Sequence, residues 1–225
     1  MKLYMHPVSM TSRPVRLFIA ENKLDVEEQI VDLMTGEHLK EPYAGMNPNK
    51  LVPMLVEDDG FRLTESSAIL KYLASRFKLP DYPTDLRKRA KVDEIMDWFN
   101  TQFYRDFGYG LAYPQIFPHH KRPSDEIQQG TIAWGQERAR GWFQILNDHW
   151  IGPRNQYLTG DQITIADYFG SCLATLGEII RCDFTAYPNV HRWLGNMKKL
   201  GSWNRINEAL VGFAGMMKDQ PFAAI

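Results

Sequence analysis

Residues 52–69 read VPMLVEDDGFRLTESSAI, and they determine the class of fold that we expect. Two short β-forming runs, 54–57 and 61–63, flank the turn Asp58-Asp59-Gly60, so the stretch predicts a β-hairpin. Residues 64–67 then open a helix with hydroxyls and a carboxylate in its first turn. Because proline cannot donate to a strand ladder, Pro53 at the entry of the hairpin raises the hypothesis of a cis Val52–Pro53 bond.

The residues on either side extend this pattern into a small α/β domain. A β-like run at 2–5, a helix with apolar positions 15, 18 and 19, a second run at 28–32 and a short polar helix at 37–43 precede the hairpin. The helix after the hairpin carries Ile69, Leu70, Leu73 and Phe77. The order is βαβαββα, and we expect a mixed sheet with helices packed on it.

A boundary near residue 80 separates this domain from a helical one. Segment 79–84, LPDYPT, is rich in turn residues, and all 6 tryptophans follow residue 97. Beyond it the apolar spacing is helical, at positions 92, 95, 96, 99 and 103 and again at 139, 142, 143, 146 and 150. The second of these helices should stop at Ile151-Gly152-Pro153, and residues 164–167 should form a capping box. We therefore predict an α/β domain at 1–79, a linker at 80–86 and an all-α domain at 87–225, with two separate cores.

Charge and composition exclude several functional classes. The 225 residues include 26 Lys+Arg and 27 Asp+Glu, so the net charge of -1 provides no overall basic field for nucleic acid or an anionic membrane. No apolar run has the length of a signal-peptide core or a membrane span. Cys172, Cys182 and the adjacent pair His119-His120 lack the spacing of metal ligands. We expect a cytoplasmic protein without a metal or a disulfide framework.

Ser12 follows the first predicted strand and opens the first helix, with Pro14 in its first turn. We predict that Ser12 is the N-cap of this helix. A hydroxyl at the positive end of a helix dipole can also donate a hydrogen bond to an anion, so Ser12 is a candidate catalytic residue. Ser9 and Thr11 on the same loop are alternatives, and capping alone would also explain a serine here.

Several motifs occur in order along almost the whole chain. They are S-x-P-x-R at 12–16, GEHLK at 36–40, Asn47-Pro48, Val52-Pro53, TESSAI at 64–69 and TIAD at 164–167. Together they resemble the glutathione S-transferase family, in particular its serine-type members of theta-like or bacterial character. The resemblance implies a thioredoxin-like first domain, an all-helical second domain, a homodimer, and glutathione as co-substrate.

The resemblance also implies roles for individual residues in binding glutathione. Ser12 matches the hydroxyl that hydrogen-bonds the glutathione sulfur. The backbone of Val52 would pair with the cysteinyl unit, and Pro53 matches the cis-proline that shapes that edge. Glu65 and Ser66 match the pair that holds the γ-glutamyl end.

The end of glutathione that carries the glycine carboxylate is expected near His38 and Lys40, again from the resemblance. Many relatives read N-P-x-G-K-V-P, whereas this chain reads NPNKLVP at 47–53. The lysine is shifted by one position. We therefore expect Lys50 to point away and His38 to carry the contact.

Residues 104–113, YRDFGYGLAY, combine aromatic side chains with two glycines, and the resemblance places this segment beside the electrophile. We predict that Tyr109 and Tyr113 line the electrophile pocket, with aromatic core packing as the alternative. Arg105 would attract an anionic substrate or stabilise a leaving halide; the alternative is an ordinary solvated charge.

The predicted function is conjugation of the glutathione thiolate to a small hydrophobic electrophile, with dehalogenation or peroxide reduction as variants of the same chemistry. The alternative is a non-catalytic protein of the same fold that binds ligands or partners. The intact set of hydroxyl, Val52-Pro53 and Glu65-Ser66 favours the enzyme. We also expect a two-fold symmetric homodimer in which the helix from residue 87 faces the partner through charged residues, namely Arg87, Arg89, Asp93 and Asp97.

Overall fold

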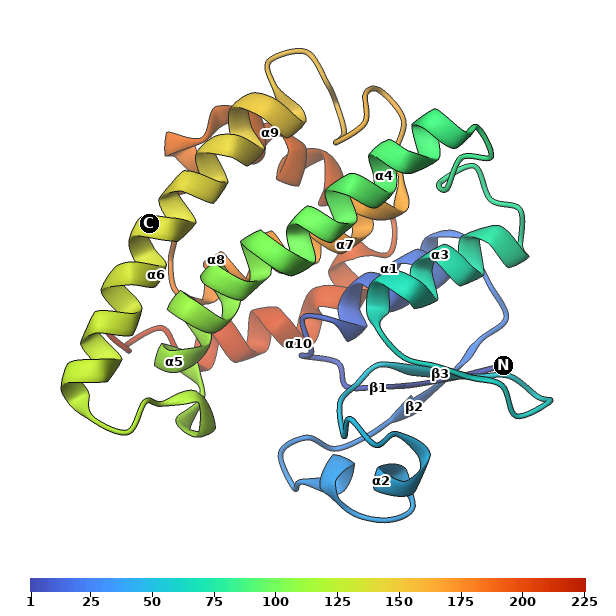
Figure 1. Ribbon diagram of the computed structural model, residues 1–225, viewed down its shortest axis with the longest axis horizontal. Coiled ribbons are helices and arrows are strands. Elements are labelled where there is room, and N and C mark those ends of the chain that lie inside the picture. The colour runs from blue at the N-terminus through green and yellow to red at the C-terminus, as the bar shows by residue number, and fades with distance from the viewer.

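The computed structural model describes Met1 to Ile225, and the chain begins with a mixed sheet of four strands. The elements of this first domain are β1 (Lys2–Met5), α1 (Ser12–Glu21), β2 (Glu27–Ile30), η1 (Glu37–Leu39), α2 (Tyr43–Met46), β3 (Met54–Val56), β4 (Arg62–Leu63) and α3 (Ser66–Arg76). The strands lie in the order β2-β1-β3-β4 (Figure 1). β1 pairs parallel with β2 and antiparallel with β3, which forms the hairpin with β4. The predicted βαβαββα order is confirmed.

One predicted element of this domain differs in detail. The polar helix expected at 37–43 is a 3₁₀ turn, η1, followed by the separate short helix α2. Pro42 lies between them and has no N–H to donate, so one continuous helix cannot form there.

The second domain is built from helices. Its elements are α4 (Leu86–Trp98), the π-helical segment η2 (Phe99–Ala112), α5 (Tyr113–Ile116), η3 (Pro118–His120), α6 (Asp125–Ile145), η4 (Leu146–Ile151), α7 (Ile165–Ala174), α8 (Leu176–Ile179), η5 (Phe184–Ala186), α9 (Pro188–Met197) and α10 (Trp203–Met216). Asp85 caps α4 by accepting a hydrogen bond from the Lys88 N–H at 2.9 Å. No helix combines the length and the apolar character that a membrane span requires.

Two predicted helix boundaries in this domain are confirmed. The helix that begins with α6 continues through η4 and ends at Ile151, where Gly152 adopts a φ of 63°. Thr164 and Asp167 form the predicted capping box at the start of α7. The Asp167 carboxylate also accepts a hydrogen bond from the indole N–H of Trp193 at 2.9 Å, so this cap links α7 to α9.

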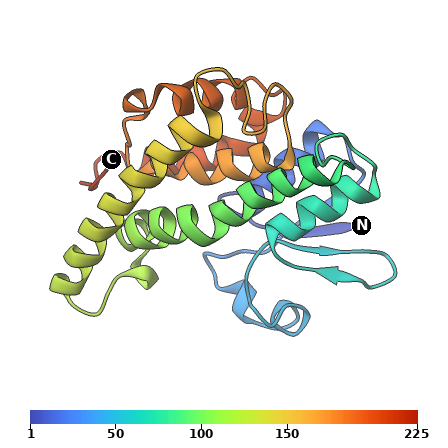
Figure 2. The ribbon, with the colours of Figure 1, turned by 45° about the horizontal axis from the view of Figure 1, so that its top comes forward.

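The two domains share one core, so the expectation of two separate cores is wrong. A single cluster of 48 buried apolar residues contains side chains from both domains. Strand β1 shows how the layers form: Leu3 and Met5 belong to this cluster, while Tyr4 packs against a small second cluster around Val31. Figures 1 and 2 show α1 and α3 between the sheet and the helical domain, with α2 on the opposite side of the sheet. Because α7 covers α1, the apolar faces of the two domains merge.

Arg13 on α1 joins the domains by polar contacts inside this core. Its side chain is completely buried, and its guanidinium donates to the Cys172 carbonyl at 2.6 Å and to the Thr175 hydroxyl at 3.3 Å. Asn207 on α10 accepts a further hydrogen bond from the same group. The Cys172 carbonyl lies in the last turn of α7, the negative end of that helix dipole, which partly compensates the buried charge. These bonds fix the start of α1 relative to the helical domain.

Candidate active site

A cavity of about 480 Å³ lies between the two domains. The first domain lines it with the loop after β1, the loops around η1 and α2, and the start of α3. The second domain lines it with η2, α5 and the loop that follows α5. A cavity of this size with polar groups on one side and rings on the other suits a small ligand.

Most of the predicted site residues gather in this cavity. Those that line it are His38, Val52, Pro53, Glu65, Ser66, Tyr109 and Tyr113. Three predicted residues, Ser12, Lys40 and Arg105, do not line it. The site is therefore in the expected place, but three of its expected members are not.

Ser12 is not the residue that the loop presents to the cavity. It is completely buried as the first residue of α1, its side chain does not cap the helix, and its hydroxyl accepts only the His6 N–H at 3.4 Å. Ser9 makes the bonds typical of an N-cap: its hydroxyl accepts from the Ser12 N–H at 3.2 Å, and its carbonyl accepts from the Arg13 N–H at 3.0 Å. The prediction that Ser12 caps α1 is wrong because the capping bonds start three residues earlier.

Ser9 and Thr11 form a short hydroxyl chain on the cavity wall. Thr11 donates its hydroxyl hydrogen to the Val52 carbonyl at 2.9 Å, so the oxygen of Thr11 can only accept from Ser9, 3.1 Å away. The Ser9 hydroxyl therefore donates to a neutral acceptor, the Thr11 oxygen. An anion in the cavity would be a stronger acceptor and would replace it. Ser9 is the hydroxyl in this loop that is free to turn towards a ligand.

The Val52–Pro53 bond is cis, as hypothesised from the sequence. The preceding turn is fixed by side chains, since Tyr43 and Asn47 both donate to the Leu51 carbonyl, at 2.5 and 2.7 Å. Beyond this turn, Val52 and Pro53 form one edge of the cavity. The backbone of Val52 is thus held in place from both sides, by this turn and by Thr11.

Glu65 has an unusual backbone conformation at the start of α3. Its φ is 63° and its ψ is 112°, a combination that is costly for a residue other than glycine. Its side chain is exposed to the cavity, and Ser66, buried, follows as the first residue of the helix. This geometry places a carboxylate, a hydroxyl and free helix N–H groups together, and such a set can hold a group that carries both an ammonium and a carboxylate.

His38 and Lys50 are two basic residues that the first domain contributes to the cavity. Lys40 is exposed outside the cavity, and its ammonium donates to the Thr35 carbonyl at 3.4 Å. Contrary to the expectation that it points away, Lys50 lines the cavity, and its φ is 54°. Burial, and the nearby His119, lower the pKa of His38, whose Nδ1 has no hydrogen-bond partner.

Tyr109 and Tyr113 form the wall that the helical domain contributes. Their rings are 5.0 Å apart and nearly perpendicular, and the Tyr113 hydroxyl bonds to that of Tyr104. Burial raises the pKa of both Tyr109 and Tyr113, and for Tyr109 the Glu65 carboxylate adds to the effect. Both hydroxyls therefore remain protonated and act as hydrogen-bonding groups rather than bases.

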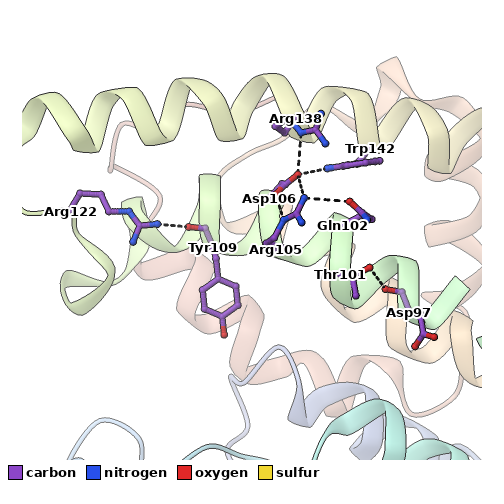
Figure 3. A network of polar contacts seen from close by, with 9 residues as sticks. All are labelled: Asp97, Thr101, Gln102, Arg105, Asp106, Tyr109, Arg122, Arg138 and Trp142. Atoms are coloured by element: carbon purple, nitrogen blue, oxygen red, sulfur yellow. Dashed lines mark hydrogen bonds and ion pairs between the residues drawn. The ribbon is translucent and has the colours of Figure 1, made fainter. Parts of the chain in front are cut away.

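Arg105 belongs to a network on the other side of η2. Its Nε donates to the buried Asp106 carboxylate at 2.7 Å, which also accepts from Arg138 at 3.2 Å and from the Trp142 indole at 2.8 Å. Figure 3 shows this network directed at α6, while the Tyr109 ring points the opposite way. The proposed contact of Arg105 with a substrate is therefore corrected: this arginine helps to join η2 to α6.

Sequence reasoning missed several residues of the cavity. Besides Ser9 and Lys50, which had been considered, these include His6, Asn100, Phe117, His119 and His120. The spacing of the adjacent histidines bears only on metal binding. They lie between two prolines and shortly after the aromatic segment 104–113, and this position was the signal that they could share its wall.

Two family models match the chain, one described as the glutathione S-transferase N-terminal domain over residues 1–75 and one as the C-terminal domain over residues 120–200. The chain belongs to the glutathione S-transferase family. The family prediction, with its thioredoxin-like first domain and helical second domain, is confirmed.

Among glutathione S-transferases, the similarity is clear to members named theta. Human glutathione S-transferase theta-1 is 37% identical over 220 residues, which cover 94% of this chain and 84% of the relative. The human theta-1 structure in its apo form matches with a TM-score of 0.81 and 30% identity, over 98% of this chain and 92% of that one. Human theta-2, solved with glutathione and an unknown ligand, matches with a TM-score of 0.82 and 26% identity, over 100% and 93% of the two chains.

Proposed function

We propose that this glutathione S-transferase conjugates the glutathione thiolate to small hydrophobic electrophiles in the cavity between its domains. The observation that carries the proposal is the division of that cavity into a polar wall and an aromatic wall. The polar wall offers a hydroxyl, a backbone edge and a helix N-terminus, which together could bind the parts of a tripeptide. The aromatic wall offers an apolar surface next to the hydroxyl.

The thiolate would be stabilised by Ser9 rather than by Ser12. A free thiol has a pKa of about 8.5, and lowering it by ~2 units requires about 2.7 kcal/mol of preferential stabilisation of the anion. A hydroxyl that donates to the sulfur and the positive end of α1 together supply an effect of that order. Ser9 has its hydrogen available for this bond, whereas Ser12 is buried below the loop.

The rest of glutathione would lie along the first domain. The carbonyl of Val52 has a second lone pair free beside its bond from Thr11, so it can accept from the cysteinyl N–H. Glu65 and Ser66 would hold the ammonium and the carboxylate of the γ-glutamyl end. His38 and Lys50 would face the glycine carboxylate. Lys50 takes the role that the sequence had suggested for Lys40.

A panel of electrophiles tests the proposal. The protein is incubated with glutathione and, separately, with alkyl halides, epoxides, α,β-unsaturated carbonyls and an organic hydroperoxide, and the loss of free thiol is measured. We expect catalysed conjugation of at least one electrophile, and the panel also shows whether dehalogenation or peroxide reduction dominates. Binding of glutathione without any catalysed loss of thiol would overturn the proposal and favour a non-catalytic ligand-binding protein.

We also propose a homodimer, which is supported by apolar side chains exposed on one edge of the molecule. Phe61 on the hairpin is 45% exposed and Leu86 at the start of α4 is 79% exposed. The hairpin and the start of α4 lie on the same side of the molecule (Figure 1). Arg89 and Asp93 both contact Tyr82 within the chain, so they contribute less to a partner than expected. Sedimentation at micromolar concentration should give a dimer; a single 26.1 kDa species would contradict it.

A further inference from the structure

The aromatic wall of the cavity contains two imidazole side chains, those of His119 and His120. Both line the cavity from η3, and no side-chain nitrogen of either residue makes a hydrogen bond within the protein. The neighbouring cavity tyrosines, Tyr104 and Tyr113, satisfy each other. The two imidazoles, together with the Tyr109 hydroxyl, are therefore polar groups of this wall that are available to a ligand.

The loop that carries these histidines is held on both sides. Arg122 donates from its guanidinium to the Tyr109 carbonyl at 3.2 Å, a bond visible in Figure 3. Its backbone N–H donates to the Gln128 side chain at 2.9 Å, and Gln128 in turn donates to the Pro114 carbonyl at 2.6 Å. The loop between α5 and α6 is thus fastened to η2 and to both neighbouring helices, so the position of the imidazoles is defined before a ligand arrives.

The two histidines differ in their surroundings. His119 is exposed and stacks on Phe117 with ring centres 5.7 Å apart. His120 is half-buried, and its ring lies 5.1 Å from Tyr113 and 5.5 Å from Tyr109. Burial, together with the neighbouring His119 and Arg122, lowers the pKa of His120. At neutral pH its imidazole is therefore uncharged, and it presents one N–H donor in an aromatic setting.

We propose that His120 forms a hydrogen-bonding subsite for the oxygen of the electrophile, and that the preferred substrates are apolar molecules whose oxygen gains negative charge during conjugation, such as α,β-unsaturated carbonyl compounds. This inference rests on the proposed function, because it assumes that glutathione occupies the first-domain wall. An uncharged donor surrounded by rings suits a ligand that is apolar apart from a single acceptor oxygen.

The chemical step gives the donor its role. The glutathione thiolate forms a bond to the β-carbon, the π electrons of the C=C bond move towards the carbonyl, and the oxygen acquires the negative charge of an enolate. The α-carbon then takes from water the proton that the thiol released when it ionised, so atoms and charges balance. A positioned N–H next to the oxygen stabilises the enolate more than the neutral carbonyl and therefore increases turnover.

A pair of matched probes tests this subsite. The first is a medium-chain α,β-unsaturated ketone and the second is an alkyl iodide of the same chain length, which has no oxygen. The measured quantity is the ratio of kcat/KM for the ketone to kcat/KM for the iodide. In His120→Phe, which keeps an aromatic ring but removes the donor, we expect this ratio to fall by about 10²-fold. His120→Gln, which restores an N–H group, should recover part of the loss.

Lys121→Gln is the matched control, since Lys121 lies on the same loop, is exposed and does not line the cavity. Its ratio should equal that of the unchanged protein. An unchanged ratio in His120→Phe, or an equal fall in Lys121→Gln, would overturn the subsite. If the unchanged protein consumes the iodide but not the ketone, the subsite fails and the proposed function stands. If it consumes no electrophile of any class with glutathione, the proposed function itself fails.

Discussion

The two walls of the cavity are built from different parts of the polypeptide. The first-domain wall combines backbone groups, at the start of α1, the edge at Val52 and the start of α3, with polar side chains such as Ser9 and Glu65. On the second-domain wall, side chains dominate, above all the rings of Tyr109, Tyr113 and His120. A backbone group keeps its chemistry when the residue changes, whereas a hydroxyl, a carboxylate or a ring does not. We therefore expect substitutions on the first-domain wall to change glutathione binding and substitutions on the second-domain wall to change the choice of electrophile.

The second-domain wall also depends on a close contact behind it. η2 and α6 approach each other so closely at Gly110 and Gly135 that a Cβ added to Gly135 would lie 2.5 Å from the carbonyl oxygen of Gly110. On the same interface the Asp106 carboxylate accepts hydrogen bonds from Arg105, Arg138 and Trp142. This contact and this network hold the segment from which Tyr109 projects (Figure 3).

The largest expected effect comes from breaking this contact. Gly135→Ala forces the backbones of η2 and α6 apart, and we expect the free energy of unfolding to fall by about 3 kcal/mol. Denaturant titration measures it. The control is Gly141→Ala on the same helix, where an added Cβ meets nothing within 4 Å and helix propensity predicts a gain of up to about 1 kcal/mol. Equal midpoints for the two variants would contradict the close packing.

A smaller effect is expected on the first-domain wall, where Glu65 is proposed to hold the ammonium group of glutathione. Glu65→Gln removes the charge but keeps the oxygen acceptor, and the KM for glutathione should rise about tenfold while kcat at saturating glutathione stays within about threefold. Steady-state kinetics at varied glutathione separate the two constants. Should kcat collapse at an unchanged KM, Glu65 would have to act in the chemical step instead.

The smallest effect is expected at Arg105, which faces α6 and not the cavity. Arg105→Ala should change kcat/KM by less than about twofold for neutral and anionic electrophiles alike. Its side chain is 55% exposed, so losing its bond to Asp106 should lower the free energy of unfolding by about 1 kcal/mol or less. A selective loss of activity with an anionic electrophile would instead support a contact between Arg105 and the substrate.

The first domain could be predicted from the sequence in more detail than the second. Its strands and turns are marked by residues with few conformational choices, such as Pro53, Gly60 and the Ser66–Ser67 helix start, and the order of elements followed from them. What the sequence did not show was that Ser9, and not Ser12, accepts the capping hydrogen bonds at the start of α1. The position of the cap depends on which residue accepts hydrogen bonds from the first backbone N–H groups of α1. That residue is Ser9, and the presence of Pro14 in the first turn does not identify it.

In the second domain, helical periodicity identified the buried positions but not the direction of each functional side chain. Val92, Ile95 and Phe103 are buried as predicted. Arg105 and Tyr109 lie only four residues apart, yet the bond of Arg105 to the Asp106 carboxylate draws its side chain one way while the Tyr109 ring points the other (Figure 3). The histidines were missed for a related reason: their place on the wall depends on how the loop between α5 and α6 is fastened, which requires long-range contacts.

The central claim is that Ser9, and not Ser12, stabilises the glutathione thiolate, and the pKa of the bound thiol tests it most directly. Ultraviolet difference spectra of the thiolate, recorded as a function of pH with saturating glutathione, give this pKa for the unchanged protein, Ser9→Ala and Ser12→Ala. We expect a pKa about 2 units below that of the free thiol in the unchanged protein and in Ser12→Ala, and a rise of about 1 to 2 units in Ser9→Ala. A low pKa that persists in Ser9→Ala, or a rise in Ser12→Ala alone, would contradict the claim.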